Sequence, residues 1–205
     1  MEEKVKNMDS KEPVKEIIRK LTVEQKRLLY TIGLYTAGEG KVGKQWLKDL
    51  SLKGLILKGI REKVFDYDYA PASVMYQSTR KVLNISQEGQ NDLNLLREYG
   101  LIARLRLGTT RHFYFNAYGL TFDGAEVFAV IPQEDRDPIE KLIHCAKCGR
   151  LYEIIPEEDS IYMTCEACDV KISTEIDDIE AVSYMCTPKW LKMRLETKWS
   201  PISKE

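Results

Sequence analysis

The chain has 205 residues, enough for one hydrophobic core of ordinary size and a small appended module. Hydrophobic residues make up 43% of it and charged residues 31%, a balance that excludes a disordered chain. No apolar run approaches the roughly 20 residues that span a bilayer, and the first residues are polar and mixed in charge. We therefore expect a cytoplasmic protein that is not secreted and has no membrane partner.

The net charge of −1 hides an uneven distribution along the chain. Residues 1–130 carry a balance of +5, and residues 131–186 carry −9. Residues 187–205 are basic again, with five Lys or Arg against two Asp or Glu. The basic and acidic parts are therefore expected to face different partners.

Helix signals fill the first part of the chain. Ser10 can cap a helix whose apolar residues recur at helical spacing from Val14 to Leu21. Thr22 and Gln25 have the spacing of a capping box and predict the start of a second helix. A third helix is expected from about Lys41 to Lys53, ending at Gly54.

The pattern then changes to strands. Phe65, Tyr67 and Tyr69 alternate with aspartates, which predicts a strand that Pro71 breaks, and residues 74–76 and 82–83 supply its return strand. Ser86 can cap a fourth helix that ends at Gly100. Residues 101–107 and 112–118 predict a second hairpin, and Thr121 can cap a fifth helix from 122 to 130.

Two short phrases flank the second hairpin, Leu96-Arg97-Glu98-Tyr99-Gly100-Leu101-Ile102 and Tyr118-Gly119-Leu120-Thr121-Phe122-Asp123-Gly124. They look like the phrases that flank the wing in winged-helix transcription regulators. Helix, turn, helix, two-stranded wing and closing helix is also the order of that domain. The resemblance implies an α+β fold with a helix-turn-helix and β-hairpin wings over residues 10–132. Two arrangements stay open, one winged helix with an extra hairpin or two units that share helices.

Four cysteines form the most specific motif. Cys145, Cys148, Cys165 and Cys168 make two C-x-x-C pairs separated by sixteen residues, a spacing typical of zinc sites. The intervening residues predict a hairpin, and the whole resembles a zinc ribbon. Four thiolates form a closed tetrahedral site, which predicts one structural Zn²⁺ and no catalysis. A rubredoxin-type iron site is the alternative, although that site has glycine where this chain has Asp169.

The cysteine motif completes the predicted division of the chain. Residues 1–9 are expected to form a flexible N-terminus and residues 10–132 the winged-helix-like domain. Residues 133–186 form the zinc ribbon and residues 187–205 a basic amphipathic tail. The tail either packs on the domain, forms a homodimer or meets a partner.

Basic residues of the third helix and the second hairpin are the candidate DNA contacts. Lysines of the third helix fall on one face at 100° per residue, and arginines tip the predicted wing. The predicted contacts are Lys41, Lys44, Gln45, Lys48, Arg104, Arg106 and Arg111. The plain alternatives are a solvated helix face and arginines whose stems pack along the sheet.

The sequence predicts a DNA-binding transcription regulator or transcription-associated factor. It resembles archaeal-type regulators and general factors that join a winged helix to a zinc ribbon. The alternative is a protein-interaction adaptor that uses the acidic ribbon and binds no DNA. An enzyme is not expected, because the chain has no glycine-rich phosphate loop, no nucleophile elbow and only two histidines.

Overall fold

The computed structural model describes residues 11–38, 42, 45–68, 70–76, 79–107, 115–156 and 161–174. Within these residues the helices are α1 (Lys11–Lys20), α2 (Val23–Thr36), α3 (Asp49–Arg61), α4 (Gln87–Glu98), α5 (Phe122–Ala129) and α6 (Gln133–Ile143). The strands are β1 (Leu47–Lys48), β2 (Ala70–Tyr76), β3 (Thr79–Ile85), β4 (Ile102–Leu107), β5 (Phe115–Leu120), β6 (Glu153–Pro156), β7 (Ile161–Cys165) and β8 (Val170–Ser173). The protein is thus a mixed α+β protein, as the sequence predicted.

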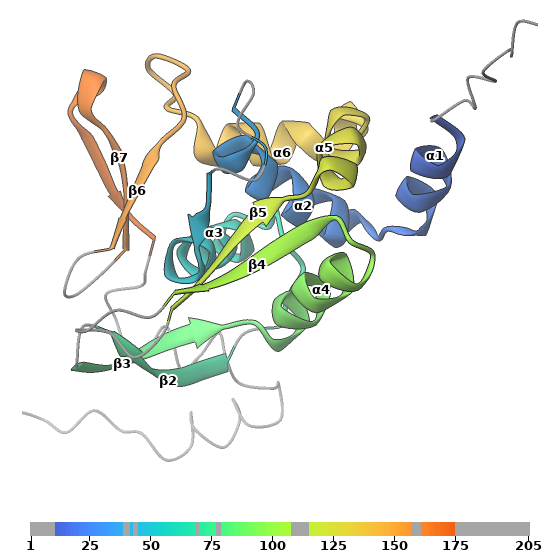
Figure 1. The fold of residues 1–205 in the computed structure, drawn as a ribbon. Helices are drawn as coiled ribbons and strands as arrows, with labels where there is room; N and C mark the ends of the chain where they lie inside the picture. Colours follow the sequence, from blue (N-terminus) through green and yellow to red (C-terminus); the bar gives the residue numbers. More distant parts are fainter. Residues whose placement is uncertain are drawn as a thin grey trace, which may run out of the picture.

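All strand pairs among the described residues are antiparallel. The described strands form a sheet of order β1-β5-β4, a β2-β3 hairpin and a sheet of order β6-β7-β8. In Figure 1 the β6-β7 hairpin stands at one end of the molecule and α1 at the other, with β4 and β5 between them. The hairpins predicted around residues 101–118 and 151–164 are confirmed in their described parts.

Helix α2 occupies the centre of the core. Leu28, Leu29 and Ile32 are fully buried, and α2 contacts α4, α5, α6 and β5. The predicted capping box is present, because the Gln25 amide N–H donates to Thr22 Oγ1 and the Thr22 amide N–H donates to Gln25 Oε1, each at 3.2 Å. A helix that is buried on most sides must be covered by elements from distant parts of the sequence.

Two further predicted caps are confirmed. Ser86 Oγ accepts from the Gly89 amide N–H at the start of α4, and Thr121 Oγ1 accepts from the Gly124 amide N–H at the start of α5, each at 2.9 Å. Gly100 adopts a φ of 72° directly after α4, the left-handed conformation that favours glycine. Local hydrogen-bond chemistry therefore determines where these helices begin and end.

Three predicted elements need correction. The third helix is not at 41–53, because α3 begins at Asp49 and Leu47 pairs with Tyr118 as part of β1. Phe65 and Tyr67 lie outside any strand, where their buried rings stack with centroids 5.3 Å apart. Pro71 lies within β2 and does not break it. The predicted Ser10 cap lies outside the described residues.

The sheet of β6, β7 and β8, called the ribbon sheet below, packs directly against α3. Gly54 of α3 faces Ile161 of β7 so closely that an added Cβ would lie 2.8 Å from Ile161 Cγ2 and 3.1 Å from Thr174 Oγ1. The Tyr35 hydroxyl also donates to the Tyr152 carbonyl at 3.0 Å, which ties α2 to the ribbon. Met163 of β7 belongs to the same buried cluster as Leu28 of α2.

We expect Gly54→Ala to destabilise the protein by about 1–3 kcal/mol, although alanine favours helices by about 1 kcal/mol over glycine. The new methyl group would push Ile161 away from α3. Gly89→Ala in α4 is the matched control, since an added Cβ there would make only ordinary contacts at 3.4 Å. Denaturant unfolding measures both variants. A Gly54→Ala protein as stable as the control would contradict this packing.

Candidate metal centre

The first cysteine pair lies in the loop that follows α6. The Cys145 amide N–H donates to the Arg150 carbonyl at 2.8 Å, and the Gly149 amide N–H donates to the Cys145 carbonyl at 2.7 Å. Gly149 has a φ of 69°, a conformation that glycine adopts without strain. This tight loop returns the chain into β6 and presents Cys145 and Cys148 on one side.

The second pair lies where β7 ends. Cys165 is the last residue of β7, and a single turn of 3₁₀-helix, Glu166–Cys168, brings Cys168 back beside it. Asp169 then adopts a φ of 51° and leads the chain into β8. The left-handed position that glycine occupies in the first loop is thus taken by an aspartate in the second.

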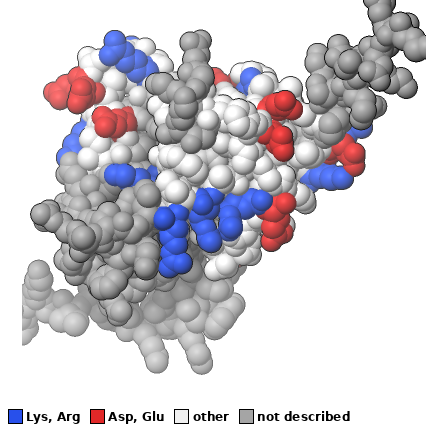
Figure 2. Space-filling model, viewed as in Figure 1, with Lys and Arg blue, Asp and Glu red and all other residues white. Residues whose placement is uncertain are grey.

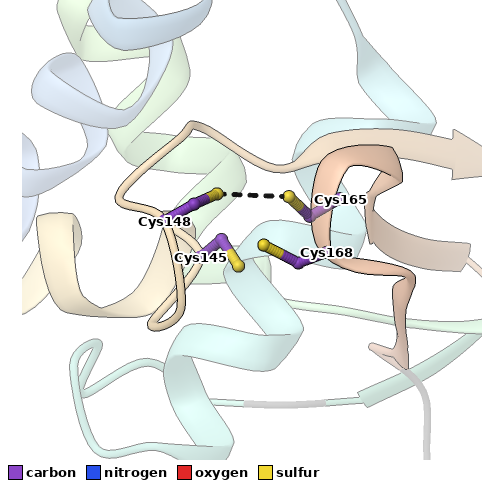
Figure 3. Close-up of side chains that lie close together, drawn as sticks. All are labelled: Cys145, Cys148, Cys165 and Cys168. Atoms are coloured by element: carbon purple, nitrogen blue, oxygen red, sulfur yellow. Dashed lines mark hydrogen bonds between the residues drawn. The ribbon is translucent and has the colours of Figure 1, made fainter.

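The four thiols converge at one point. Their Sγ atoms all lie within 4.8 Å of one another, and Cys148 Sγ lies 3.5 Å from Cys165 Sγ. Figure 3 shows the four side chains pointing toward a common centre, two from each loop. Cys145 and Cys165 are buried, Cys168 is half-buried and Cys148 is exposed. The cluster therefore has a dry side against the core and a wet side.

The cluster has the dimensions of a metal site. Zn–S bonds of about 2.3 Å in a tetrahedron separate the sulfurs by about 3.8 Å. This separation lies between the 3.5 Å of the Cys148–Cys165 pair and the 4.8 Å within which all four Sγ atoms lie. Four cysteines this close could hold a metal ion. His144 is not part of the cluster, and its Nδ1 lies 2.9 Å from the Glu140 carbonyl oxygen.

Without a cation the four thiols compete for ionisation. Burial raises the pKa of Cys145, but amide N–H groups of Lys147 and Cys148 and the neighbouring thiols outweigh it, and the pKa falls to about 6. The hydrogen bond with Cys148, together with burial, raises the pKa of Cys168 to about 12. Burial also raises the pKa of Cys165. An ionised thiol disfavours ionisation of its neighbours, so four thiolates this close together require a cation among them.

The predicted DNA contacts are only partly within the described residues. Arg104 and Arg106 lie exposed on one face of β4. Gln45 precedes β1 outside any helix, and Lys48 lies in β1, so neither occupies the predicted helix face. Lys41, Lys44 and Arg111 lie outside the described residues.

Strand register separates Lys48 from the arginines. Lys48 pairs with Ala117, which pairs with Leu105, whereas Arg104 pairs with Tyr118. Side chains alternate between the two faces of a strand, so Lys48 and Arg104 point to opposite faces of the sheet. The basic residues of β1 and β4 do not form a single stripe.

Two features of the described structure were not predicted from the sequence. Helix α6 was not predicted, although Ile139, Leu142 and Ile143 have helical spacing, because Pro132 suggested a domain boundary. The exposed amide side chains of α4 were also missed, because lysine and arginine were the signal that was sought.

Fold and site together define a mixed α+β protein with a four-cysteine cluster that could hold a metal ion. The chain belongs to the Uncharacterized protein MJ1567 family, whose model matches residues 24–174. This match runs from α2 to β8 and covers the cysteine cluster together with every described helix except α1. No curated protein and no solved structure matches the chain. Among the described residues, no helix is long and apolar enough to cross a membrane.

Proposed function

We propose that this protein binds duplex DNA, as a transcription regulator or transcription-associated factor with one structural Zn²⁺. The observation that carries the proposal is the succession of α4, the β4-β5 hairpin and α5, with β1 paired to the far side of β5. A helix, a two-stranded wing and a closing helix are the parts of a winged-helix domain. The β2-β3 hairpin is then an insertion between α3 and α4.

Basic side chains on this part of the molecule support the proposal. In Figure 2 lysines and arginines gather in a row over the region where Figure 1 places β4 and α4. Arg104 and Arg106 belong to β4, and Arg97 is in the last turn of α4. Arg104 pairs with Tyr118 across the β4-β5 hairpin, and burial raises the pKa of Tyr118 while the smaller, opposite effect of the Arg104 and Arg97 charges lowers it. Arginines grouped in this way suit contacts with phosphates.

Helix α4 takes the role first assigned to residues 41–53. It directly precedes the wing, and its exposed face carries polar side chains beside Arg97. In this arrangement α4 enters the major groove and the β4 arginines contact the backbone. A salt-titrated DNA-binding assay on Arg104→Ala/Arg106→Ala tests the proposal.

Zinc is the metal we propose for the cysteine cluster. Four thiolates suit zinc's closed tetrahedral site, which leaves no position for a substrate or an activated water. The role would be structural and the protein non-enzymatic. Reduced thiols also fit the cytoplasm, where disulfides are rare.

A protein-docking role is the second candidate, and the exposure of α5 favours it. Phe122 is 79% exposed and Val130, directly after α5, is 51% exposed, so both offer apolar surface to a partner. If docking is the function, Phe122→Ser should abolish capture of a partner and leave the fold unchanged, because little burial is lost. Co-purification followed by circular dichroism measures both. Equal capture by parent and variant would remove this candidate.

A further inference from the structure

The exposed face of α4 carries a line of amide side chains. Gln87, Asn91 and Asn94 lie at i, i+4 and i+7, within about 60° of one another around the helix. Gln87 and Asn91 are exposed and Asn94 is half-buried. The line contains no lysine or arginine, and Glu98 follows it at the C-terminal end.

The opposite side of α4 fixes this line toward solvent. Leu93 and Leu96 are buried in the core. Gln25 Nε2 donates to Asp92 Oδ1, and the Tyr67 hydroxyl donates to Asp92 Oδ2, each at 2.8 Å. Because both carboxylate oxygens of Asp92 are bonded to other elements, α4 cannot rotate about its axis without breaking these bonds. The amide line is therefore preorganised.

Two contacts already order the line, and one of them runs from Arg97 Nη1, which donates to Asn94 Oδ1 at 3.4 Å. Gln87 Nε2 donates to Asn91 Oδ1 at 3.1 Å. The Asn91 oxygen retains a second lone pair, and its NH₂ group retains its two donors. Asn91 can thus offer one donor and one acceptor side by side while Gln87 holds it in place.

The chemistry of this face matches adenine. The major-groove edge of adenine presents an N7 acceptor beside an N6 donor, the complement of an asparagine or glutamine amide. Guanine presents two acceptors and is read by arginine or lysine, and Arg97, the arginine beside the line, already donates to Asn94. Leu95 lies beside the line and is 36% exposed, so it can contact the methyl group of thymine.

We propose that Asn91 and Asn94, with Gln87 as the orienting neighbour, read adenines of A·T base pairs in the major groove. This inference rests on the proposed binding of duplex DNA. Residues near the N-terminus of such a helix meet the base edges, which favours these three positions over Glu98. The arginines of β4 supply affinity, and the amides of α4 supply the choice of sequence.

The test begins with selection of bound duplexes from a random library by the parent protein. A·T base pairs are expected at the centre of the selected site. Asn91→Ala/Asn94→Ala loses two amide–adenine contacts, so its binding of the selected site should weaken by about 30-fold or more while its binding of random duplex stays nearly unchanged. Replacing the site's adenines with 7-deazaadenine, which lacks the N7 acceptor, should weaken the parent and not the variant.

Gln133→Ala provides the control, since Gln133 is an exposed amide at the start of α6. It should retain the parent's preference. A selected site of G·C pairs, or an Asn91→Ala/Asn94→Ala protein that keeps the preference, overturns the adenine inference and leaves DNA binding standing. A parent protein that binds no duplex at all overturns both.

Discussion

Cys148→Ser should abolish binding of the proposed zinc ion and unfold the β6-β7-β8 sheet. Structural zinc contributes about 10–16 kcal/mol in small zinc modules, as much as the whole stability of a typical domain, about 5–15 kcal/mol. Cys148 is exposed, so the replacement itself creates no buried cavity. Metal analysis should find one zinc per parent chain and almost none in the variant. The fifth cysteine provides the control, because Cys186→Ser leaves all four clustered thiols in place.

The damage should extend beyond the ribbon, but not through the whole protein. Amide hydrogen exchange should lose protection in β6, β7 and β8 and on the side of α3 that contacts Ile161, because these segments pack on one another. Protection of β4 and β5 should persist. A parent protein free of metal, or a variant with unchanged exchange, would contradict a structural metal site.

Arg104→Ala/Arg106→Ala should weaken DNA binding about 10-fold or more at low salt. Each lost phosphate contact lowers the slope of log K against log salt by about 0.9, so the double variant should lose about 1.8 from that slope. Fluorescence anisotropy over a salt series measures both quantities. A smaller salt slope indicates that phosphate contacts were lost. A variant that is merely partly unfolded would bind less at every salt concentration without this change in slope.

Lys141→Ala/Lys147→Ala is the matched control for charge. Both lysines are exposed and lie in α6 and the first cysteine loop, away from β4, so binding should change little. Lys44→Ala/Lys48→Ala examines the original lysine prediction. If this variant and the arginine variant both bind DNA like the parent, the proposal that these residues contact DNA is wrong.

Features determined by neighbouring residues could be predicted from the sequence. The caps at Thr22, Ser86 and Thr121 and the end of α4 at Gly100 depend on side chains within three or four residues of the backbone they satisfy. The cysteine cluster was predictable for a similar reason, since each C-x-x-C pair is itself a local loop.

Features determined by distant residues could not be predicted from the sequence. Residues 41–50 have helical spacing, but Leu47 pairs with Tyr118, and that long-range pairing overrides the local preference. The close packing of Gly54 on Ile161 joins residues more than 100 positions apart, so no local pattern reveals it. The winged-helix arrangement and the choice of DNA therefore remain proposals that rest on topology and charge.

The central position of α2 has a consequence for synthesis of the chain. Leu28, Leu29 and Ile32 are made early, yet they are covered by β5 and α6, about 90–110 residues later. A nascent chain that ends before residue 115 leaves this helix with α4 but without β5, α5 and α6, a state prone to aggregation. Burial of α2 must therefore wait until the chain has emerged beyond α6, so segments made late determine whether an early helix becomes buried.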